Sequence, residues 1–189
     1  QAYLICIFIY LIYIDLYFYF HFGVYLMRVL YIEPFSGASG DMFLGNLVDL
    51  GADKDFIRNE ISKCVDVSVS FKRCFKKGIL ATKADVKIPG IENTEEQFLH
   101  KNFKTYSEII KIIKSSDLNS EVKSDTLSIF EIMARAESKV HGISIDKIHF
   151  HEVGQDDAIA DVVGSCAGFY SLRNRKDTAF ASIHCAIVN

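Results

Sequence analysis

The sequence predicts an α/β fold in which helices flank a mixed sheet. Short segments of alternating apolar residues, typical of β-strands, are followed by longer segments in which apolar residues recur every three or four positions, as in helices. The two kinds of segment alternate along the chain after residue 26, which is typical of this fold class. Half of the 189 residues are apolar and the formal net charge is −3. This balance excludes a disordered chain and a nucleic-acid-binding protein that depends on bulk positive charge.

The β-type segments are bounded by turn residues. Strands are predicted over residues 28–35, 146–153 and 178–188, and a hairpin over residues 67–88 that turns around Lys77 and Gly78. Residues 89–97 have the composition of a loop. The hairpin is rich in lysine and arginine, which predicts a solvated face, with an anion-binding surface as the alternative.

The helical segments lie between these strands, and Gly142 is a stop signal for the longest of them. Helices are predicted over residues 42–53, 53–64, 105–116, 119–142 and 156–172. The spacing of apolar residues predicts which side chains of the second and third helices point inward: Phe56, Ile57, Ile61 and Cys64, then Tyr106, Ile109, Ile110 and Ile113.

Residues 1–26 differ in composition from the rest of the chain. They hold ten of its 24 aromatic residues and no lysine or arginine. Their length and apolarity suit a membrane-spanning helix, but Asp15 near the middle would cost about 2.5–3.5 kcal/mol on insertion scales. A signal peptide would need a basic start and a small-residue cleavage site. We therefore expect residues 1–26 to lie outside the native domain, which begins at Met27; a membrane anchor, a signal peptide and a buried hairpin are the alternatives.

The five cysteines are scattered, at positions 6, 64, 74, 166 and 185. An odd number without close pairs indicates free thiols in a reducing compartment, not a disulfide framework. We therefore expect a cytoplasmic protein that meets a membrane only if residues 1–26 are native.

The first candidate site is the turn "SGASGD", residues 36–41, between a predicted strand and a predicted helix. Gly37 and Gly40 permit backbone conformations closed to other residues, and Ser36 and Ser39 add hydroxyl groups. Such a turn directs backbone N–H groups at an anion, which suits a phosphate, while Asp41 could hold a bridging divalent cation. A tight turn without a ligand is the alternative. On the phosphate hypothesis, a β-branched residue at Gly40 would block nucleotide binding and spare metal binding.

The second candidate site is the segment "KIHFHEVGQDDAIADVVG", residues 147–164. Strand alternation would put His149 and His151 on one face, about 7 Å apart. Asp157 and Asp161 are four residues apart and share one face of the following helix. The two faces can converge at the carboxyl end of the strand, where open α/β sheets bind ligands. Two imidazoles and two carboxylates suit a first-row divalent ion such as Mn, Fe, Co, Ni or Zn.

Glu152 would point away from these ligands on a regular strand. It could then orient a ligand histidine from behind, or act as a base. The alternative for the whole segment is a polar strand end followed by a helix in which Asp156 and Asp157 merely favour the helix dipole.

Four segments resemble the LarC-like nickel-insertion family in type and order: "FSGASGDM", "HKNFKTYSEI", "KVHGISIDKIHFHEVG" and "DAIADVVG". The resemblance spans residues 27 to about 185. It implies CTP-dependent insertion of nickel into pyridinium-3,5-bisthiocarboxylic acid mononucleotide, which makes the nickel-pincer cofactor, by a nickel chelatase of the cyclometallase-type lyase class. It also implies that residues 27–189 are the N-terminal domain of a larger protein, truncated at the C-terminal end. This chain is then a fragment.

The family pattern carries over onto both candidate sites and onto His100, although Gln155, Asp156 and Ala158 depart from it. We assign catalytic roles to Glu152 and His100. We assign binding of CTP with Mg or Mn to Ser36, Gly37, Ser39, Gly40 and Asp41. We assign nickel to His149, His151, Asp157 and Asp161.

Two other functions fit the same residues. One is a non-catalytic metal- or nucleotide-binding module that needs a separate C-terminal polypeptide, and the other is a metal-dependent phosphohydrolase. The expected partners are the pyridinium bisthiocarboxylate mononucleotide, CTP and that C-terminal polypeptide, with a homo-oligomer as a further candidate and no nucleic acid.

Overall fold

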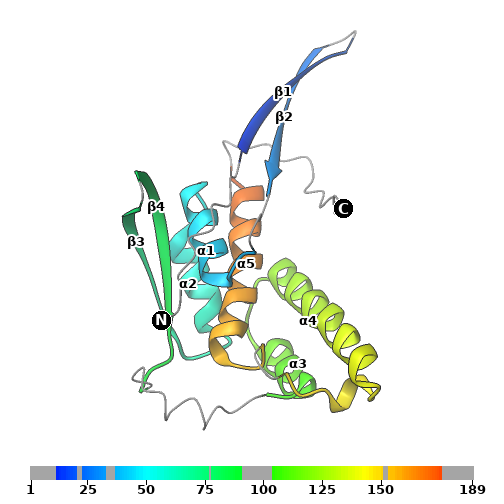
Figure 1. Cartoon of the computed structure of the whole chain (residues 1–189). Helices are drawn as coiled ribbons and strands as arrows, with labels where there is room; N and C mark the ends of the chain where they lie inside the picture. The colour runs from blue at the N-terminus through cyan, green and yellow to red at the C-terminus, as the bar shows by residue number, and fades with distance from the viewer. Residues whose placement is uncertain are drawn as a thin grey trace.

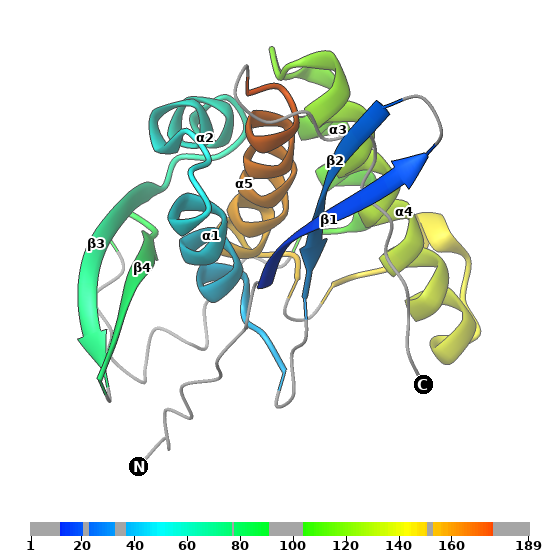
Figure 2. The same ribbon diagram turned by 90° about the horizontal axis from the view of Figure 1, so that it is seen from above.

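The computed structural model describes residues 12–20, 23–32, 37–76, 78–90, 104–150 and 153–175. In these residues the chain forms five α-helices, a 3-10 helix and two separate antiparallel hairpins. Figures 1 and 2 show the helices gathered into one body, with β3 and β4 along one side of it. The predicted α/β class is confirmed. The predicted strand at residues 178–188 and most of the predicted loop at residues 89–97 lie outside the described residues.

The first hairpin crosses the position where the composition changes. Strand β1, Ile12–Phe20, pairs with β2, Gly23–Tyr31, in a register that places Leu16 opposite Met27. The strand predicted from residue 28 therefore begins earlier, at Gly23. Figure 1 shows the hairpin projecting from the helical body. The exclusion of residues 1–26 from the domain stays a prediction. Among the described residues, no helix has the length and apolarity needed to cross a bilayer.

Helices α1, Gly40–Asp49, and α2, Lys54–Ser62, both pack on α5, Asp156–Arg173. The Asp53 side chain caps α2 by accepting hydrogen bonds from the backbone N–H groups of Asp55 and Phe56. Glycines on α5 allow the close packing: a Cβ at Gly164 would lie 2.8 Å from methyl groups of Leu44 and Ile61. The predicted helices over residues 42–53, 53–64 and 156–172 are confirmed, with shifted ends.

The second hairpin joins β3, Ser68–Lys76, to β4, Ile79–Lys87, as predicted. Gly78 adopts a φ of 84°, which a turn of this kind requires and which glycine permits. The hairpin attaches to α1 through Asp49, whose carboxylate accepts hydrogen bonds from the backbone N–H and the hydroxyl of Thr82, both 2.7 Å long.

Helix α3, Tyr106–Ser115, and α4, Ser120–His141, confirm two further predictions. Thr105 and Glu108 form a capping box at the start of α3, which satisfies backbone donors on both sides. Gly142 ends α4 with a left-handed φ of 66°. These local signals explain why both helix boundaries were readable from the sequence.

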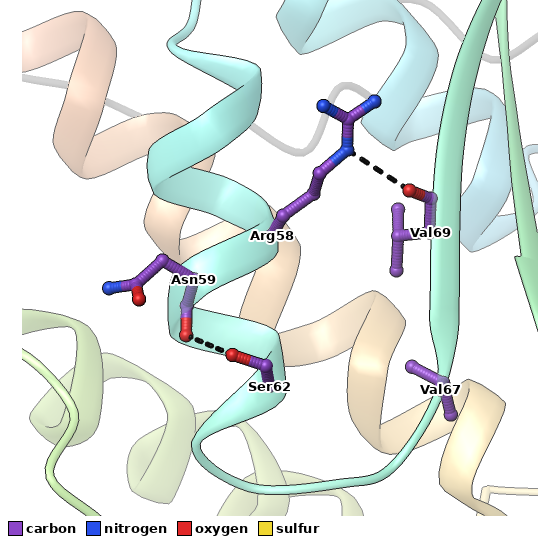
Figure 3. Close-up of a pocket in the computed structure, with 5 residues that line it drawn as sticks. All are labelled: Arg58, Asn59, Ser62, Val67 and Val69. Atoms are coloured by element: carbon purple, nitrogen blue, oxygen red, sulfur yellow. Dashed lines mark hydrogen bonds between the residues drawn. The ribbon is translucent and has the colours of Figure 1, made fainter.

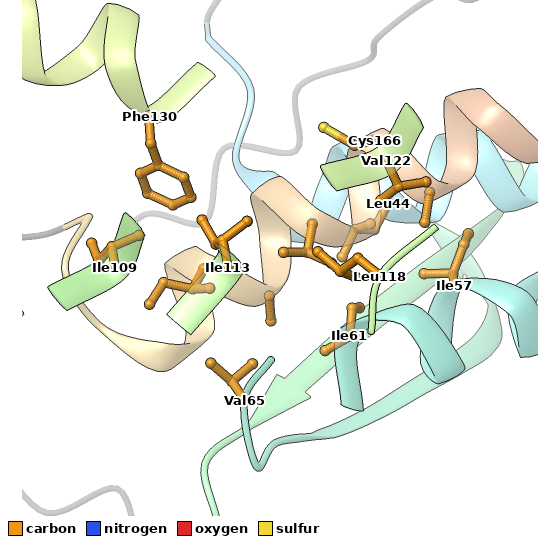
Figure 4. Close-up of a cluster of buried hydrophobic side chains, with 14 of the residues drawn as sticks. Leu44, Ile57, Ile61, Val65, Ile109, Ile113, Leu118, Val122, Phe130 and Cys166 are labelled. Atoms are coloured by element: carbon orange, nitrogen blue, oxygen red, sulfur yellow. The ribbon is translucent and has the colours of Figure 1, made fainter. Parts of the chain in front are cut away.

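The hydrophobic core lies where α5 meets the other helices (Figure 4). The inward positions predicted for α2 and α3 are confirmed. Ile57, Ile61, Ile109 and Ile113 are buried, and Phe56, Cys64, Tyr106 and Ile110 are partly buried against the same core.

The strand predicted over residues 146–153 is wrong in extent. Ile145–Lys147 forms a 3-10 turn, and the extended backbone that follows makes one isolated antiparallel bridge, between His149 and Thr105. The alternation that suggested a strand is nevertheless present, because Ile148 and Phe150 are buried and His149 between them is exposed. The described part of the segment packs against α3 and α4 through its apolar residues, and it extends neither of the two hairpins that the structure describes.

Candidate functional site

The N-terminal turn of α1 lies directly against the second turn of α5. A Cβ built on Gly40 would lie 2.5 Å from the Cβ of Asp161 and would overlap its carboxylate. No side chain could occupy position 40 without displacing Asp161. The sequence predicts that Gly40 is needed for its backbone conformation. In the structure it is needed because its lack of a side chain allows the Asp161 carboxylate of α5 to approach.

Asp161 is the most perturbed carboxyl group among those that the structure describes. Its pKa is raised from the usual 3.8 to about 7, chiefly by burial and in addition by the negative charges of Asp41 and Asp157. Its Oδ1 atom is buried and has no hydrogen-bond partner. A buried carboxylate oxygen without a donor is costly, and a bound cation would remove that cost. We call Asp41, Asp157 and Asp161 the carboxylate cluster.

Asp41 shapes the start of α1. Its Oδ1 accepts a hydrogen bond of 2.8 Å from the backbone N–H of Met42 and another from the hydroxyl of Ser39. The Met42 contact occupies one of the N–H groups that a phosphate on this turn would use. With three carboxylates close to the turn, a phosphate would need an accompanying cation.

The carboxylate cluster is an incomplete metal site in the residues that the structure describes. Among those residues, no three His, Cys, Asp or Glu side chains are placed to hold one ion together. The N–H of Ala158 donates to Oδ1 of Asp157 over 2.8 Å, so this carboxylate points partly at its own helix end. A complete site would need rotation of these side chains or ligands from residues outside the described set.

The predicted site residues thus fall into four groups. Asp41, Asp157 and Asp161 come together, with Gly40 packed against Asp161. His149 is exposed, and its electrostatic influence falls on Glu108 at the start of α3, where it is one of the lesser causes that lower the pKa of that carboxyl group. Gly37 and Ser39 are exposed on the turn. The remaining predicted residues, Ser36, His100, His151 and Glu152, lie outside the described residues.

Sequence reasoning separated Asp41 from the two α5 aspartates, assigning it to a nucleotide and them to nickel. The structure unites them. The only signal for this in the sequence was the glycine before Asp41, because a glycine at a helix start can mark a close approach of another element. The contact of Lys104 with Asp156, described below, was also missed.

A separate open pocket of about 350 Å³ lies between α2 and the segment leading into β3 (Figure 3). Arg58 and Val69 line it, and the Arg58 Nε donates to the Val69 carbonyl over 3.0 Å. The guanidinium also pairs with Asp55 and lies over the ring of Phe71. This pocket contains none of the predicted site residues, and its arginine is engaged in structural contacts.

An α/β body with a partly buried, mutually repelling carboxylate cluster where two helices meet fits the class of proteins that handle cations. Comparison with known proteins makes the class specific. The profile of the family described as nickel insertion protein matches residues 30–186, most of the chain. The chain belongs to this family.

Curated relatives agree with that assignment. A relative from Methanococcoides burtonii is 48% identical over 147 residues, which are 78% of this chain and 35% of the relative. The pyridinium-3,5-bisthiocarboxylic acid mononucleotide nickel insertion protein of Thermotoga sp. strain RQ2 is 42% identical over 86% of this chain and 40% of its own length. The protein of the same name from Geobacillus kaustophilus is 41% identical over 77% of this chain and 36% of its own length.

The chain accordingly spans well under half the length of the curated relatives that it matches. No solved structure matches it significantly.

Proposed function

We propose that this chain takes part in the insertion of nickel into pyridinium-3,5-bisthiocarboxylic acid mononucleotide, the substrate in the names of two of its relatives. Nickel is the cargo of this reaction, not a resident cofactor. The relatives are much longer than this chain, so turnover by the chain alone is the result that separates this proposal from the binding module described below.

The observation that carries the proposal is the buried Oδ1 of Asp161, which has no hydrogen-bond donor and lies under the influence of two further carboxylates. The cluster concentrates negative charge without supplying its own counter-charge, so a divalent cation would relieve the repulsion. Carboxylate oxygens are harder ligands than thiolates, and they suit a site that must pass its nickel on.

The roles of single residues follow from this arrangement as expectations. Asp157 and Asp161 would bind nickel, joined by His149 and His151 from the preceding segment. Glu152 and His100 would move protons or orient a ligand. To reach Asp157 and Asp161, His100 would have to approach from the segment before α3. His149, His151 and Glu152 would have to approach from the segment before α5.

We further expect the reaction to depend on CTP. Asp41 is the described carboxylate that would hold the Mg²⁺ or Mn²⁺ accompanying the nucleotide, and the turn at residues 36–41 would contact its phosphates. The close fit of Gly40 to Asp161 places this turn directly beside the predicted nickel ligands.

A second candidate function is a nickel- or nucleotide-binding module that acts only together with a separate C-terminal polypeptide. The chain spans 35–40% of these relatives, and this candidate assigns the rest of the family protein to a second polypeptide. The two candidates differ in whether the isolated chain turns over.

The experiment is a nickel titration of the chain and of its Asp161→Asn and Asp157→Asn variants, followed by incubation with the pyridinium substrate, nickel and CTP. The proposal expects nickel binding that each substitution weakens at least tenfold. Formation of the nickel product by the chain alone would favour the enzyme, and formation only with the C-terminal polypeptide would favour the module. Wild-type nickel affinity in both variants would refute the proposal, and CTP hydrolysis without substrate and nickel would favour a phosphohydrolase.

A further inference from the structure

Residues 104–106 hold both ends of the loop that carries the predicted histidines. The backbone N–H of Lys104 donates to the carbonyl of Gly154 over 3.1 Å, and the N–H of Tyr106 donates to the carbonyl of Ile148 over 3.0 Å. Thr105, between them, forms the bridge to His149. Two residues of extended backbone span about 7 Å, so the loop 148–154 is closed at its base. We call residues 104–106 the clamp.

The side chain of Lys104 extends this attachment to α5. Its Nζ lies 2.6 Å from Oδ1 of Asp156, the first residue of that helix. The pair is partly buried, with 24% of the lysine side chain and 32% of the aspartate side chain exposed, so water screens it less than a surface ion pair. Asp156 adjoins Asp157 of the carboxylate cluster. One lysine therefore connects the base of the histidine loop to the helix of the predicted aspartate ligands.

Gly154 shows how tightly the clamp fits. A Cβ at this position would lie 2.7 Å from the Phe150 carbonyl oxygen and 2.8 and 3.0 Å from the backbone oxygen and nitrogen of Lys104. All three neighbours are backbone atoms, which cannot turn aside as a side chain can. The glycine is needed because the clamp and the loop touch here.

The clamp is itself fixed to the core. Thr105 and Glu108 form the capping box of α3, and the hydrogen bonds from Thr105 lower the pKa of the Glu108 carboxyl group. The ring of Tyr106 lies edge-on to Phe150 at a centroid distance of 6.5 Å, and Phe150 is fully buried. The two described ends of the loop, Ile148 and Gly154, are thus bonded to a segment that is itself fixed to α3.

From these contacts we infer that Lys104 is a positioning residue for the nickel site: through Asp156 and the loop base, it sets the placement of His149 relative to Asp157 and Asp161. The inference rests on the proposed function for the identity of the ligand, nickel. The contacts of Lys104 with Asp156 and Gly154 are independent of that function. Lys104 does not itself touch the metal. Its role is that of a residue which orients the metal ligands without binding the metal.

Lys104→Met tests the inference in the full chain, because methionine keeps much of the apolar stem and removes the ammonium group. We expect nickel affinity, measured by calorimetry, to fall about 10–100-fold, the range typical of outer-shell partners. Lys104→Arg should recover most of the loss, since its guanidinium can reach the same carboxylate. Asp156→Asn should reproduce the loss, and the double variant Lys104→Met/Asp156→Asn should lose no more than either single variant, because the two residues act as one unit.

Lys111→Met is the matched control, because it removes the same charge from an exposed position on α3. It should leave nickel affinity unchanged, which separates positioning from a change in overall charge. Circular dichroism should show that all variants are folded.

Hydrogen exchange gives a readout that needs no metal. The amides of Lys104 and Tyr106 should exchange faster in Lys104→Met than in the wild type, and no faster in Lys111→Met. Two results for Lys104→Met would overturn the inference. One is faster amide exchange with unchanged nickel affinity. The other is unchanged amide exchange, whatever happens to the nickel affinity. A wild-type chain that binds no nickel would refute the proposed function instead, and the exchange of these two amides would still decide whether Lys104 positions the loop.

Discussion

Gly40 and Asp161 are in such close contact that even a methyl group at position 40 would overlap the Asp161 carboxylate. The contact joins the turn assigned to a nucleotide with the helix assigned to nickel. The N-terminal end of α1 carries a partial positive charge, which favours carboxylates there. Burial of Asp161 and the negative charges of Asp41 and Asp157 act in the opposite direction and raise the pKa of Asp161.

The first prediction concerns Gly40→Val. The sequence alone predicts loss of nucleotide binding with metal binding spared. The structure predicts that the valine side chain displaces Asp161, so nickel affinity should fall as well, by tenfold or more. Calorimetry with nickel, and separately with CTP and Mg²⁺, would measure both. Ala38→Val is a control in the same turn, at an exposed position. Unchanged nickel affinity in a folded Gly40→Val protein would contradict the structural expectation.

The second prediction concerns the pH dependence of stability without metal. Because the pKa of Asp161 is about 7 in the folded chain and 3.8 in its usual state, the folded chain holds a proton that the unfolded chain has released between these values. The free energy of unfolding should therefore fall as pH rises from about 4 to about 7, and this contribution should be fully lost above that range. Asp161→Asn should abolish this part of the pH dependence. Urea unfolding at a series of pH values would measure it.

Asp41→Asn provides the comparison for that experiment. Since Asp41 is the largest electrostatic cause of the shift after burial, its removal should move the fall in stability to lower pH without abolishing it. An identical pH dependence in the wild type and Asp161→Asn would show that Asp161 does not titrate in this range.

Much of the fold was predictable because its signals are local. The helix boundaries at Thr105, Gly142 and Asp53 depend on capping groups within four residues of the boundary. The hairpin turn at Gly78 is equally local. The segment around His149 was not predictable in the same way, since its alternating pattern fits a strand and an extended segment that packs on helices equally well. Only the absence of a neighbouring strand in the described residues, apart from the bridge at Thr105, distinguishes the two.

The candidate site was predictable in its residues but not in its grouping. Asp157 and Asp161 are four apart on one helix, which the spacing reveals directly. Asp41 is more than a hundred residues away, and its place beside them depends on how α1 packs on α5, which no local pattern encodes. The same is true of Lys104 and Asp156, which are 52 residues apart.

A third prediction concerns Glu60, whose side chain is buried on α2. Its carboxylate accepts a hydrogen bond of 2.7 Å from the backbone N–H of Asn119, the cap of α4, and pairs with Lys63. Glu60→Leu should leave that N–H without a partner and lower the free energy of unfolding by about 1–3 kcal/mol. Glu60→Gln keeps an acceptor and should cost less. Denaturant unfolding of both variants would test the order, and a leucine variant as stable as the wild type would contradict it.

A fourth prediction concerns packing between α1 and the second hairpin. A Cβ on Gly45 would overlap the backbone carbonyl oxygen of Thr82, which a side-chain rotation cannot relieve. Gly45→Ala gains helix propensity of about 1 kcal/mol, but the overlap should cost about 1–3 kcal/mol. A net loss of stability by thermal unfolding is expected. The control is Ser124→Ala on the exposed face of α4, which introduces an alanine into a helix without a backbone overlap. Gly142→Ala would not serve, because Gly142 has a left-handed φ. A stabilised Gly45→Ala protein would show that α1 and β4 can separate at little cost.

The last prediction concerns His149, the one predicted imidazole ligand that the structure describes. Its side chain is exposed between two buried neighbours, Ile148 and Phe150, so His149→Ala removes little core and should leave the unfolding midpoint nearly unchanged. Nickel affinity should nevertheless fall by orders of magnitude if the imidazole joins Asp157 and Asp161 as a ligand, because a bond to the metal is lost and no neighbour replaces it. His141→Ala, at the exposed end of α4, is the matched control and should bind nickel as the wild type does. Calorimetric titration of both variants, with thermal unfolding beside it, separates the outcomes. Equal nickel affinity in His149→Ala and His141→Ala would remove His149 from the site and leave the carboxylate cluster to bind with other residues.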